Sequence, residues 1–224
     1  MSTIHRISRF GLMNAFLVDE DDGFTLVDTM LGADQKILGA AAGLGKPIVR
    51  IALTHAHGDH IGSLDALKAA LPEAEVSISV RDARLLAKDM SHDPGEEGTF
   101  KGDYRGAKTT PDVLLSAGDR VGSLEVVAAP GHTPGHVAFL DTRDGALICG
   151  DAFATVGAVA TCAKPAARFP LTGFGTWNRD LALESARALR ALDPTSLAPG
   201  HGKIVTGPVA AMDAAIARTE KALA

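Results

Sequence analysis

The feature that most constrains the fold of this chain is an apolar run, Ile48–Thr54, that ends in a cluster of polar side chains. A largely continuous apolar run is typical of a strand covered on both faces of its sheet. It leads straight into "HAHGDH", which holds His55, His57, Asp59 and His60. Polar groups crowded into one turn are difficult to explain as packing. They indicate that a positive charge lies among them.

The order of elements along the chain predicts an α/β fold with two sheet-and-helix halves. "DEDDG" (19–23) reads as a hairpin turn between two of the first strands. The expected strands cover residues 3–10, 13–19, 24–29, 48–54, 75–80, 124–130, 136–142, 146–151 and, as the last one, 195–200. The expected helices cover residues 33–44, the segment after the histidine cluster, 81–89, 177–192 and the segment that begins at Pro208.

The helix after the histidine cluster is expected to carry Asp59 as its N-cap, because a short carboxylate at that position accepts a free backbone N–H. Its apolar face is marked at near-helical spacing by Ile61, Leu64, Leu67 and Leu71. The sequence therefore predicts a single helix that begins at the cluster.

Two segments lack periodicity, residues 89–112 and 153–176. Loops of this length inside a compact domain are usually functional or mobile, so we expect substrate selection there. Lys101, Lys164 and Arg168 are candidate partners for a substrate carboxylate. For any single one of them, an ordinary surface position is the favoured interpretation.

Composition limits the class of protein. The 224 residues fit one domain, 1–224, with a hydrophobic fraction of 46% and a net charge of −5, which disfavours nucleic acid as a partner. The apolar stretch 146–163 contains Asp151 and is rich in Gly and Ala, so no membrane contact is expected. Cys149 and Cys162 form no CxxC pair, and the first ten residues, "MSTIHRISRF", lack the apolar core of a signal peptide, so none is expected. The expected location is the cytoplasm, and the oligomeric state is not indicated.

Three further candidate ligands each follow an apolar strand and are flanked by Gly or Pro: His132 in "APGHTPGH", Asp151 in "LICGD" and His201 in "LAPGHG". Strand ends at one edge of a sheet converge, so these loops can meet the first cluster. Imidazole and carboxylate together suit Zn²⁺, Mn²⁺ or Fe. Two such ions about 3.5–4 Å apart would share a bridging carboxylate, for which Asp151 is the candidate.

These four motifs, in this order, resemble those of the metallo-β-lactamase superfamily. The resemblance implies a four-layer αββα sandwich with a two-metal site at its edge. It implies that metal one is held by His55, His57 and His132, that metal two is held by Asp59, His60 and His201, and that Asp151 bridges them. The expected cofactors are two divalent ions, with Zn²⁺ first and Fe or Mn as alternatives.

Other candidates near the motifs have weaker interpretations. His5, His92 and His136 are left out as ligands, although His136 is a candidate for shaping its turn. Asp28, in "LVDT", either ends a strand or orients the histidine loop from behind the ligands. The sequence does not decide between these two roles.

The expected reaction is metal-assisted hydrolysis, in which the ions lower the pKa of a shared water and Asp59 moves a proton. The resemblance is greatest to small glyoxalase II-like hydrolases, and the expected partner is a small-molecule acyl substrate: a thioester, a lactone or another ester. Lactonase relatives have a Tyr near Phe153, which lacks a hydroxyl, so weak lactone hydrolysis is expected. The alternatives are a mononuclear-iron persulfide dioxygenase and a metal-binding domain without catalysis.

Overall fold

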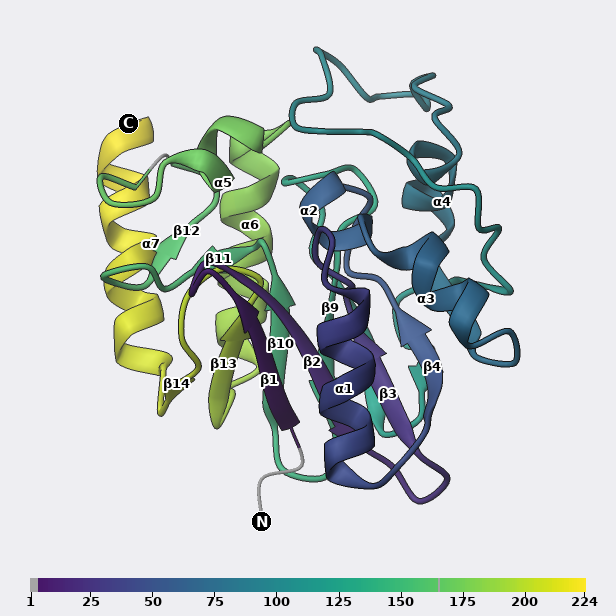
Figure 1. Cartoon of the computed structure of the whole chain (residues 1–224). Coiled ribbons are helices and arrows are strands. Elements are labelled where there is room, and N and C mark those ends of the chain that lie inside the picture. Colours follow the sequence, from purple (N-terminus) through teal and green to yellow (C-terminus); the bar gives the residue numbers. More distant parts are fainter. Residues whose placement is uncertain (1–3, 165) are drawn as a thin grey trace.

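The computed structural model describes residues 4–164 and 166–224, and its elements form four layers (Figure 1). Two six-stranded sheets face each other in the middle, and helices cover the outer face of each sheet. The αββα architecture predicted from the sequence is therefore confirmed. Among the described residues, no helix is long and apolar enough to cross a membrane.

The first sheet has the strand order β1-β2-β3-β4-β5-β6. Strands β1 to β3 are antiparallel and β3 to β6 are parallel. The hairpin turn expected at 19–23 joins β2 to β3. The bounds are β1 (Ile4–Arg9), β2 (Met13–Asp19), β3 (Phe24–Val27), β4 (Ile48–Ala52), β5 (Glu75–Ser79) and β6 (Val113–Leu115).

The second sheet has the strand order β14-β13-β10-β9-β8-β7 and is antiparallel except for the pair β10 and β13. A separate two-stranded hairpin, β11 (Phe153–Ala154) and β12 (Ala160–Thr161), follows β10. The bounds of the sheet strands are β7 (Arg120–Val121), β8 (Leu124–Ala128), β9 (Val137–Asp141), β10 (Ala146–Gly150), β13 (Ser196–Pro199) and β14 (Val205–Thr206).

Three apolar cores hold the layers together. The inner core lies between the sheets and contains Phe16 from β2 and Phe139 from β9. The first sheet packs on α1 (Asp34–Leu44), α2 (Gly58–Ile61), α3 (Leu64–Ala70) and α4 (Val80–Leu86). The second sheet packs on α6 (Arg179–Ala191) and α7 (Val209–Leu223), and the short α5 (Leu171–Gly175) precedes α6. Strand β10 is buried along its whole length, as expected for a strand with an apolar run that is covered on both faces.

The single helix predicted after the histidine cluster is wrong, because the chain forms two short helices there, α2 and α3. Gly62 lies at the break, where a Cβ atom would come within 2.7 Å of Leu31 Cδ1. Ser63 Oγ accepts a hydrogen bond from Ala33 N at 2.7 Å, which holds the redirected chain. His57, not Asp59, is the N-cap of α2, so Asp59 lies in the first turn with its side chain free for the site.

Short strands account for the other differences from the sequence prediction. Strand β13 is not the last one, because β14 pairs with it after the 199–204 turn. The segment 153–176 was expected to be irregular but contains β11, β12 and α5. Elements of two to five residues carry too little periodicity to be detected from sequence.

Candidate metal centre

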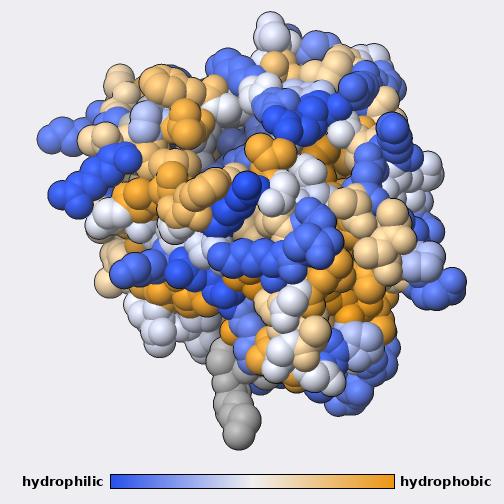
Figure 2. Space-filling view, in the orientation of Figure 1, coloured by the Kyte–Doolittle hydropathy of each residue, from blue (hydrophilic) through white to orange (hydrophobic). Residues whose placement is uncertain are grey.

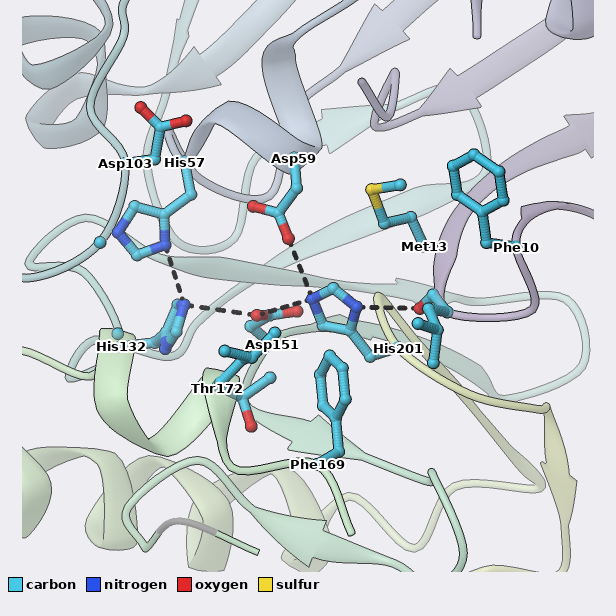
Figure 3. A pocket seen from close by; sticks show the side chains of 14 residues that line it. Phe10, Met13, His57, Asp59, Asp103, His132, Asp151, Phe169, Thr172 and His201 are labelled. Carbon is cyan, nitrogen blue, oxygen red and sulfur yellow. Dashed lines mark hydrogen bonds and ion pairs between the residues drawn. The ribbon is translucent and has the colours of Figure 1, made fainter. Parts of the chain in front are cut away.

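The seven candidate ligands lie together at one edge of the sandwich, where the strands that carry them end. The first cluster begins three residues after β4 and runs into α2, and Asp151 directly follows β10. The loops after β8 and β13 bring His132 and His201 to the same place. Figure 3 shows most of this arrangement around a cavity. The convergence predicted from strand ends is therefore present in the structure.

The first ligand group consists of His55, His57 and His132, and all three are buried. His57 Nδ1 lies 3.0 Å from His132 Nε2. The ring centroid of His55 lies 4.8 Å from that of His57 and 4.9 Å from that of His132. One donor atom of each residue lies within 4.8 Å of the others, so the three imidazoles face one point.

The second ligand group consists of Asp59, His60 and His201. His201 Nε2 lies 3.2 Å from Asp59 Oδ2. Asp151 lies between the two groups, because its Oδ2 is 3.4 Å from His132 Nε2 and its Oδ1 is 3.2 Å from His60 Nε2. Asp151 therefore has the position that a bridging carboxylate would need.

Hydrogen bonds on the far side of each imidazole determine which nitrogen points inward. The Nδ1 atoms of His55 and His132 lie 3.0 Å from the hydroxyls of Thr54 and Thr176, and each hydroxyl has an acceptor of its own. Since each hydroxyl donates to that acceptor, the Nδ1–H donates to the hydroxyl. His57 is reversed, because its Nε2 lies 2.8 Å from Lys101 O. The rings of His55, His57 and His132 thus each turn an unprotonated nitrogen to the centre, as metal-ligating histidines do.

At the centre, His55 Nε2 is buried without a hydrogen-bond partner, and His60 Nε2 and Asp151 Oδ1, which form an ion pair at 3.2 Å, have no partner besides each other. Leaving buried acceptors unpaired is costly, and a cation is the partner that all three can share. Gly200 has space for no side chain, since a Cβ there would lie 2.5 Å from Asp151 Oδ1. The residues present therefore fit the two divalent ions that the sequence predicts.

Asp28 has both of the roles that the sequence left open. It directly follows β3, in a left-handed backbone conformation with φ 60°. Its carboxylate accepts hydrogen bonds from Thr54 N at 2.9 Å and from Thr54 Oγ1 at 2.8 Å, and it lies 2.8 Å from His60 Nδ1. Asp28 thus orients ligands of both groups, directly for His60 and through Thr54 for His55.

Asp82 is a functional candidate that the sequence analysis missed. It is fully buried in the first turn of α4, and it accepts hydrogen bonds from Ala56 N at 2.9 Å, Thr133 Oγ1 at 2.8 Å and Gly135 N at 2.8 Å. These partners belong to the two loops that carry the first ligand group. Burial raises the pKa of Asp82 to about 6, against the opposing effect of these bonds. In the sequence it looks like an ordinary helix residue.

His136, which the sequence leaves out as a ligand, contacts the site from behind. Its Nε2 accepts a hydrogen bond from Asp151 N at 3.0 Å, so it supports the backbone of the central carboxylate. Burial lowers the pKa of His136 to about 3, which keeps the ring neutral and able to accept that bond. His5 and His92 lie away from the cluster, beside Asp19 and Phe100.

The two ligand groups differ in their electrostatics. Burial holds the pKa values of His55 and His132 well below the ordinary value. Burial alone would also lower the pKa of His201, but Asp151 and Asp59 outweigh it and raise that pKa to about 10. The pKa of His60 is raised well above its ordinary value in the same way, because Asp151 and Asp28 outweigh the effect of burial. Burial would raise the pKa of Asp59, but His60 and His201 hold it well below its usual range.

A cavity of about 420 Å³ opens onto the cluster. Its lining includes Asp59, Asp151 and several apolar side chains, but none of Lys101, Lys164 and Arg168. Lys164 and Arg168 line a separate cavity instead. The residues 153–176 do contribute to the first cavity through their second half, 169–175.

Phe153 does not line the cavity. It is fully buried in the core between the second sheet and its helices, where it packs with residues such as Leu197 and Met212. The expectation that a hydroxyl at this position would reach a substrate is therefore wrong. Strand β11 turns the side chain into the core rather than toward the ligands. Cys149 lies in the same core.

Comparison with known proteins agrees with this geometry. The family model of the metallo-beta-lactamase superfamily matches residues 9–201. The chain belongs to this superfamily. The uncharacterized protein YobT of Bacillus subtilis (strain 168) is 44% identical over 212 residues, which cover 93% of this chain and 91% of YobT.

Two other relatives of this superfamily member carry more specific descriptions. A hydroxyacylglutathione hydrolase from Synechococcus sp. is 35% identical over 127 residues, but the match spans only 41% of that enzyme. The crystal structure of TTHA1623 in a di-iron-bound form is 27% identical, with a TM-score of 0.67 over 92% of this chain and 96% of that one. Similar chains are thus described as a hydroxyacylglutathione hydrolase and as a protein with a di-iron-bound form.

Proposed function

We propose that this superfamily member is a metal-dependent hydrolase that cleaves a small ester, thioester or lactone with two divalent ions. The observation that carries the proposal is the convergence of seven histidine and aspartate side chains on one centre, with every histidine ring held from behind by a hydrogen bond. The similarity to a hydroxyacylglutathione hydrolase supports the reaction class. Zn²⁺ is the first expectation for the ions, and Fe or Mn are the alternatives.

When bound, the ions would activate water near neutral pH and supply positive charge to the carbonyl and the leaving group. The chain's own residues would hold the reactants. His55, His57 and His132 form the rigid side of the centre, because burial and their outer hydrogen bonds fix their orientation. The substrate would enter by the cavity, whose volume of about 420 Å³ suits a small molecule.

Asp59 is the residue proposed to move the proton. Its side chain is 37% exposed, whereas those of His60 and His201 beside it are nearly inaccessible. It lines the cavity, so its carboxylate can exchange a proton with a substrate bound there. Its contact with His201 keeps the carboxylate directed at the centre.

The test combines metal analysis with a substrate panel. Protein purified without added metal should contain about two ions per chain, and it should hydrolyse at least one member of an ester, thioester and lactone panel. His57→Ala should abolish this activity. Asp59→Asn should lower kcat more than it changes KM, while Asp103→Asn, at the same cavity but outside the cluster, should retain activity.

Three results would count against the proposal. Full turnover in Asp59→Asn would remove this residue from the mechanism. A single iron with oxygen uptake on glutathione persulfide would identify a dioxygenase instead. Metal binding without any turnover across the panel would indicate a domain that acts through binding alone.

A further inference from the structure

The cavity beside the ligand cluster has an apolar wall made by two loops. One is the turn between β1 and β2, which contributes Phe10, Leu12 and Met13. The other is the segment that enters α5, which contributes Phe169 and Leu171. Figure 3 shows Phe10 and Met13 on one side of His201 and Phe169 on another. Figure 2 shows hydrophobic side chains gathered on this face around α5 and the β1–β2 turn.

The wall covers the second ligand group rather than the first. The ring centroid of Phe169 lies 4.8 Å from that of His201. Met13 forms an isolated β-bridge with His201, and Leu12 O lies 2.9 Å from His201 Nδ1. A substrate bound at the cluster would therefore extend its non-reacting part along this apolar surface, beside His201.

The charged residues of the lining are all acidic apart from the histidines: Asp59, Asp103 and Asp151. Lys101 and Arg168 adjoin lining residues in the sequence but do not line the cavity, and two arginines of the surrounding loops have partners. Arg9 donates to the carbonyls of Leu31 and Gly32, and Arg105 pairs with Asp103. Among the described residues, the lining of the cavity thus offers apolar contact but no lysine or arginine for a substrate carboxylate.

Phe10 has a conformation that packing does not explain. It is 78% exposed, in a three-residue turn between the paired Arg9 and Met13. Its φ is 56°, in the left-handed region that bulky side chains rarely adopt. A strained, exposed aromatic residue at the mouth of a site suggests a role in binding, because strain of this kind concentrates at ligand contacts.

We propose that the substrate is an uncharged ester or thioester with an apolar chain, and that Phe10 and Leu171 determine this specificity. The inference rests on the proposed hydrolase function and narrows its substrate class. The chain would lie against the two loops, over the Asp59 and His201 half of the centre. Because this contact is remote from the bond that breaks, it stabilises the bound substrate and the transition state equally. A longer chain should lower KM and leave kcat nearly unchanged.

The experiment uses two series of uncharged substrates with the metal-loaded protein. One series is acyl thioesters of N-acetylcysteamine with acyl chains of increasing length, and the other is acetate esters of alcohols from methanol to octanol. In at least one series kcat/KM should rise by about fourfold per methylene until the wall is covered, the factor that corresponds to ~0.8 kcal/mol per buried CH₂. S-octanoyl glutathione should be a poorer substrate than the octanoyl thioester of N-acetylcysteamine.

Variants of the wall residues test whether the dependence on chain length arises at this surface. Phe10→Ala and Leu171→Ala should flatten the dependence on chain length through KM. Phe174→Ala is the matched control, because Phe174 is 61% exposed on the same short helix as Leu171, which is 65% exposed, but does not line the cavity. This control should keep the dependence. All three changes are at exposed positions, so the fold should be retained.

The outcomes separate the two proposals. Hydrolysis with no chain-length dependence in either series, or a preference for the glutathione thioester, would overturn this inference and leave the hydrolase proposal standing. If no substrate is turned over, the apolar site can still be tested by measuring the binding of the uncharged ligands octanamide and acetamide with calorimetry. Tighter binding of octanamide that is lost in Phe10→Ala supports the apolar site, and equal binding of the two ligands overturns it.

Discussion

The two ligand groups of the candidate metal centre are similar in residue type and opposite in electrostatics. In the first group, burial dominates and keeps the pKa values of His55 and His132 low, so these rings are neutral at physiological pH. In the second group, neighbouring carboxylates outweigh burial and raise the pKa values of His60 and His201. Without metal, the second group is a cluster of ion pairs. The first group can accept a cation at once, whereas the second must first lose protons.

The largest expected difference between the groups concerns catalysis. His132→Ala removes a ligand from the neutral group and should lower kcat/KM by roughly a thousandfold or more, since a bound ion is worth several kcal/mol and each 1.36 kcal/mol is tenfold. His201→Ala should reduce the second ion's occupancy but leave the first ion bound. Hydrolysis rates and metal content of both variants check this. Equal metal loss in both would mean that the two groups act as one site.

The pH dependence of metal binding should also separate the groups. A histidine with a raised pKa is protonated below that pKa, so the second ion must displace one or two protons from His60 and His201 at neutral pH. Its affinity should therefore fall by about 10- to 100-fold per unit as the pH is lowered. The first ion displaces none from His55 or His132 until the pH is well below 6.5. Metal content measured from pH 8 to pH 5 should show the second ion leaving first, and simultaneous loss would contradict the comparison.

Much of the fold and the ligand set follows from the sequence, because both depend on strong local signals. The apolar runs before His55, Asp151 and His201 predict strands, and residues at the ends of neighbouring strands must meet. The break at Gly62 could not be predicted, since it depends on a contact with Leu31 from another loop. The same applies to Phe153, because alternation in a two-residue strand does not reveal which face is buried.

The residues that support the ligands were harder to predict than the ligands themselves. Asp28 follows a strand in the same way as Asp151, so its position suggested a role at the site. Asp82 has no such signal, because its three partners lie in loops that are 26 to 53 residues away in the chain. Supporting contacts of this kind depend on tertiary packing, which only the structure supplies.

A substitution at Asp82 tests how the first ligand group is oriented, because it changes the support of the two ligand loops and leaves every ligand in place. Asp82→Asn replaces one carboxylate oxygen with an NH₂ group, which cannot accept a hydrogen bond, so the variant loses either the bond from Gly135 N or the two from Ala56 N and Thr133 Oγ1. Metal affinity of the first group should fall by about 10- to 100-fold, the usual cost of losing a residue that orients ligands. A competition titration with a chromophoric chelator measures this directly.

The control for Asp82→Asn is Asp65→Asn. Asp65 also accepts hydrogen bonds from two backbone N–H groups, those of Lys108 and Thr109, but it is exposed and takes no part in the ligand loops. Its loss should leave metal affinity unchanged. If both variants weaken metal binding equally, the effect of Asp82 is one of general stability and not of ligand orientation.

The smallest expected effect concerns the strained turn between β1 and β2, which contains Phe10. Phe10 and Asp28 both adopt left-handed φ, but the carboxylate of Asp28 has three hydrogen-bonding partners at the centre, whereas Phe10 is exposed. Asn tolerates this conformation better than Phe, because its short polar side chain bonds locally. Phe10→Asn should therefore raise the free energy of unfolding by about 1 kcal/mol, or Tm by roughly 2–4 °C in a chain of this size. Thermal unfolding of the metal-loaded variant tests this. A fall in Tm would mean that the contact of the Phe10 ring with the Arg9 guanidinium, 5.0 Å from its centroid, stabilises the turn by more than the strain costs.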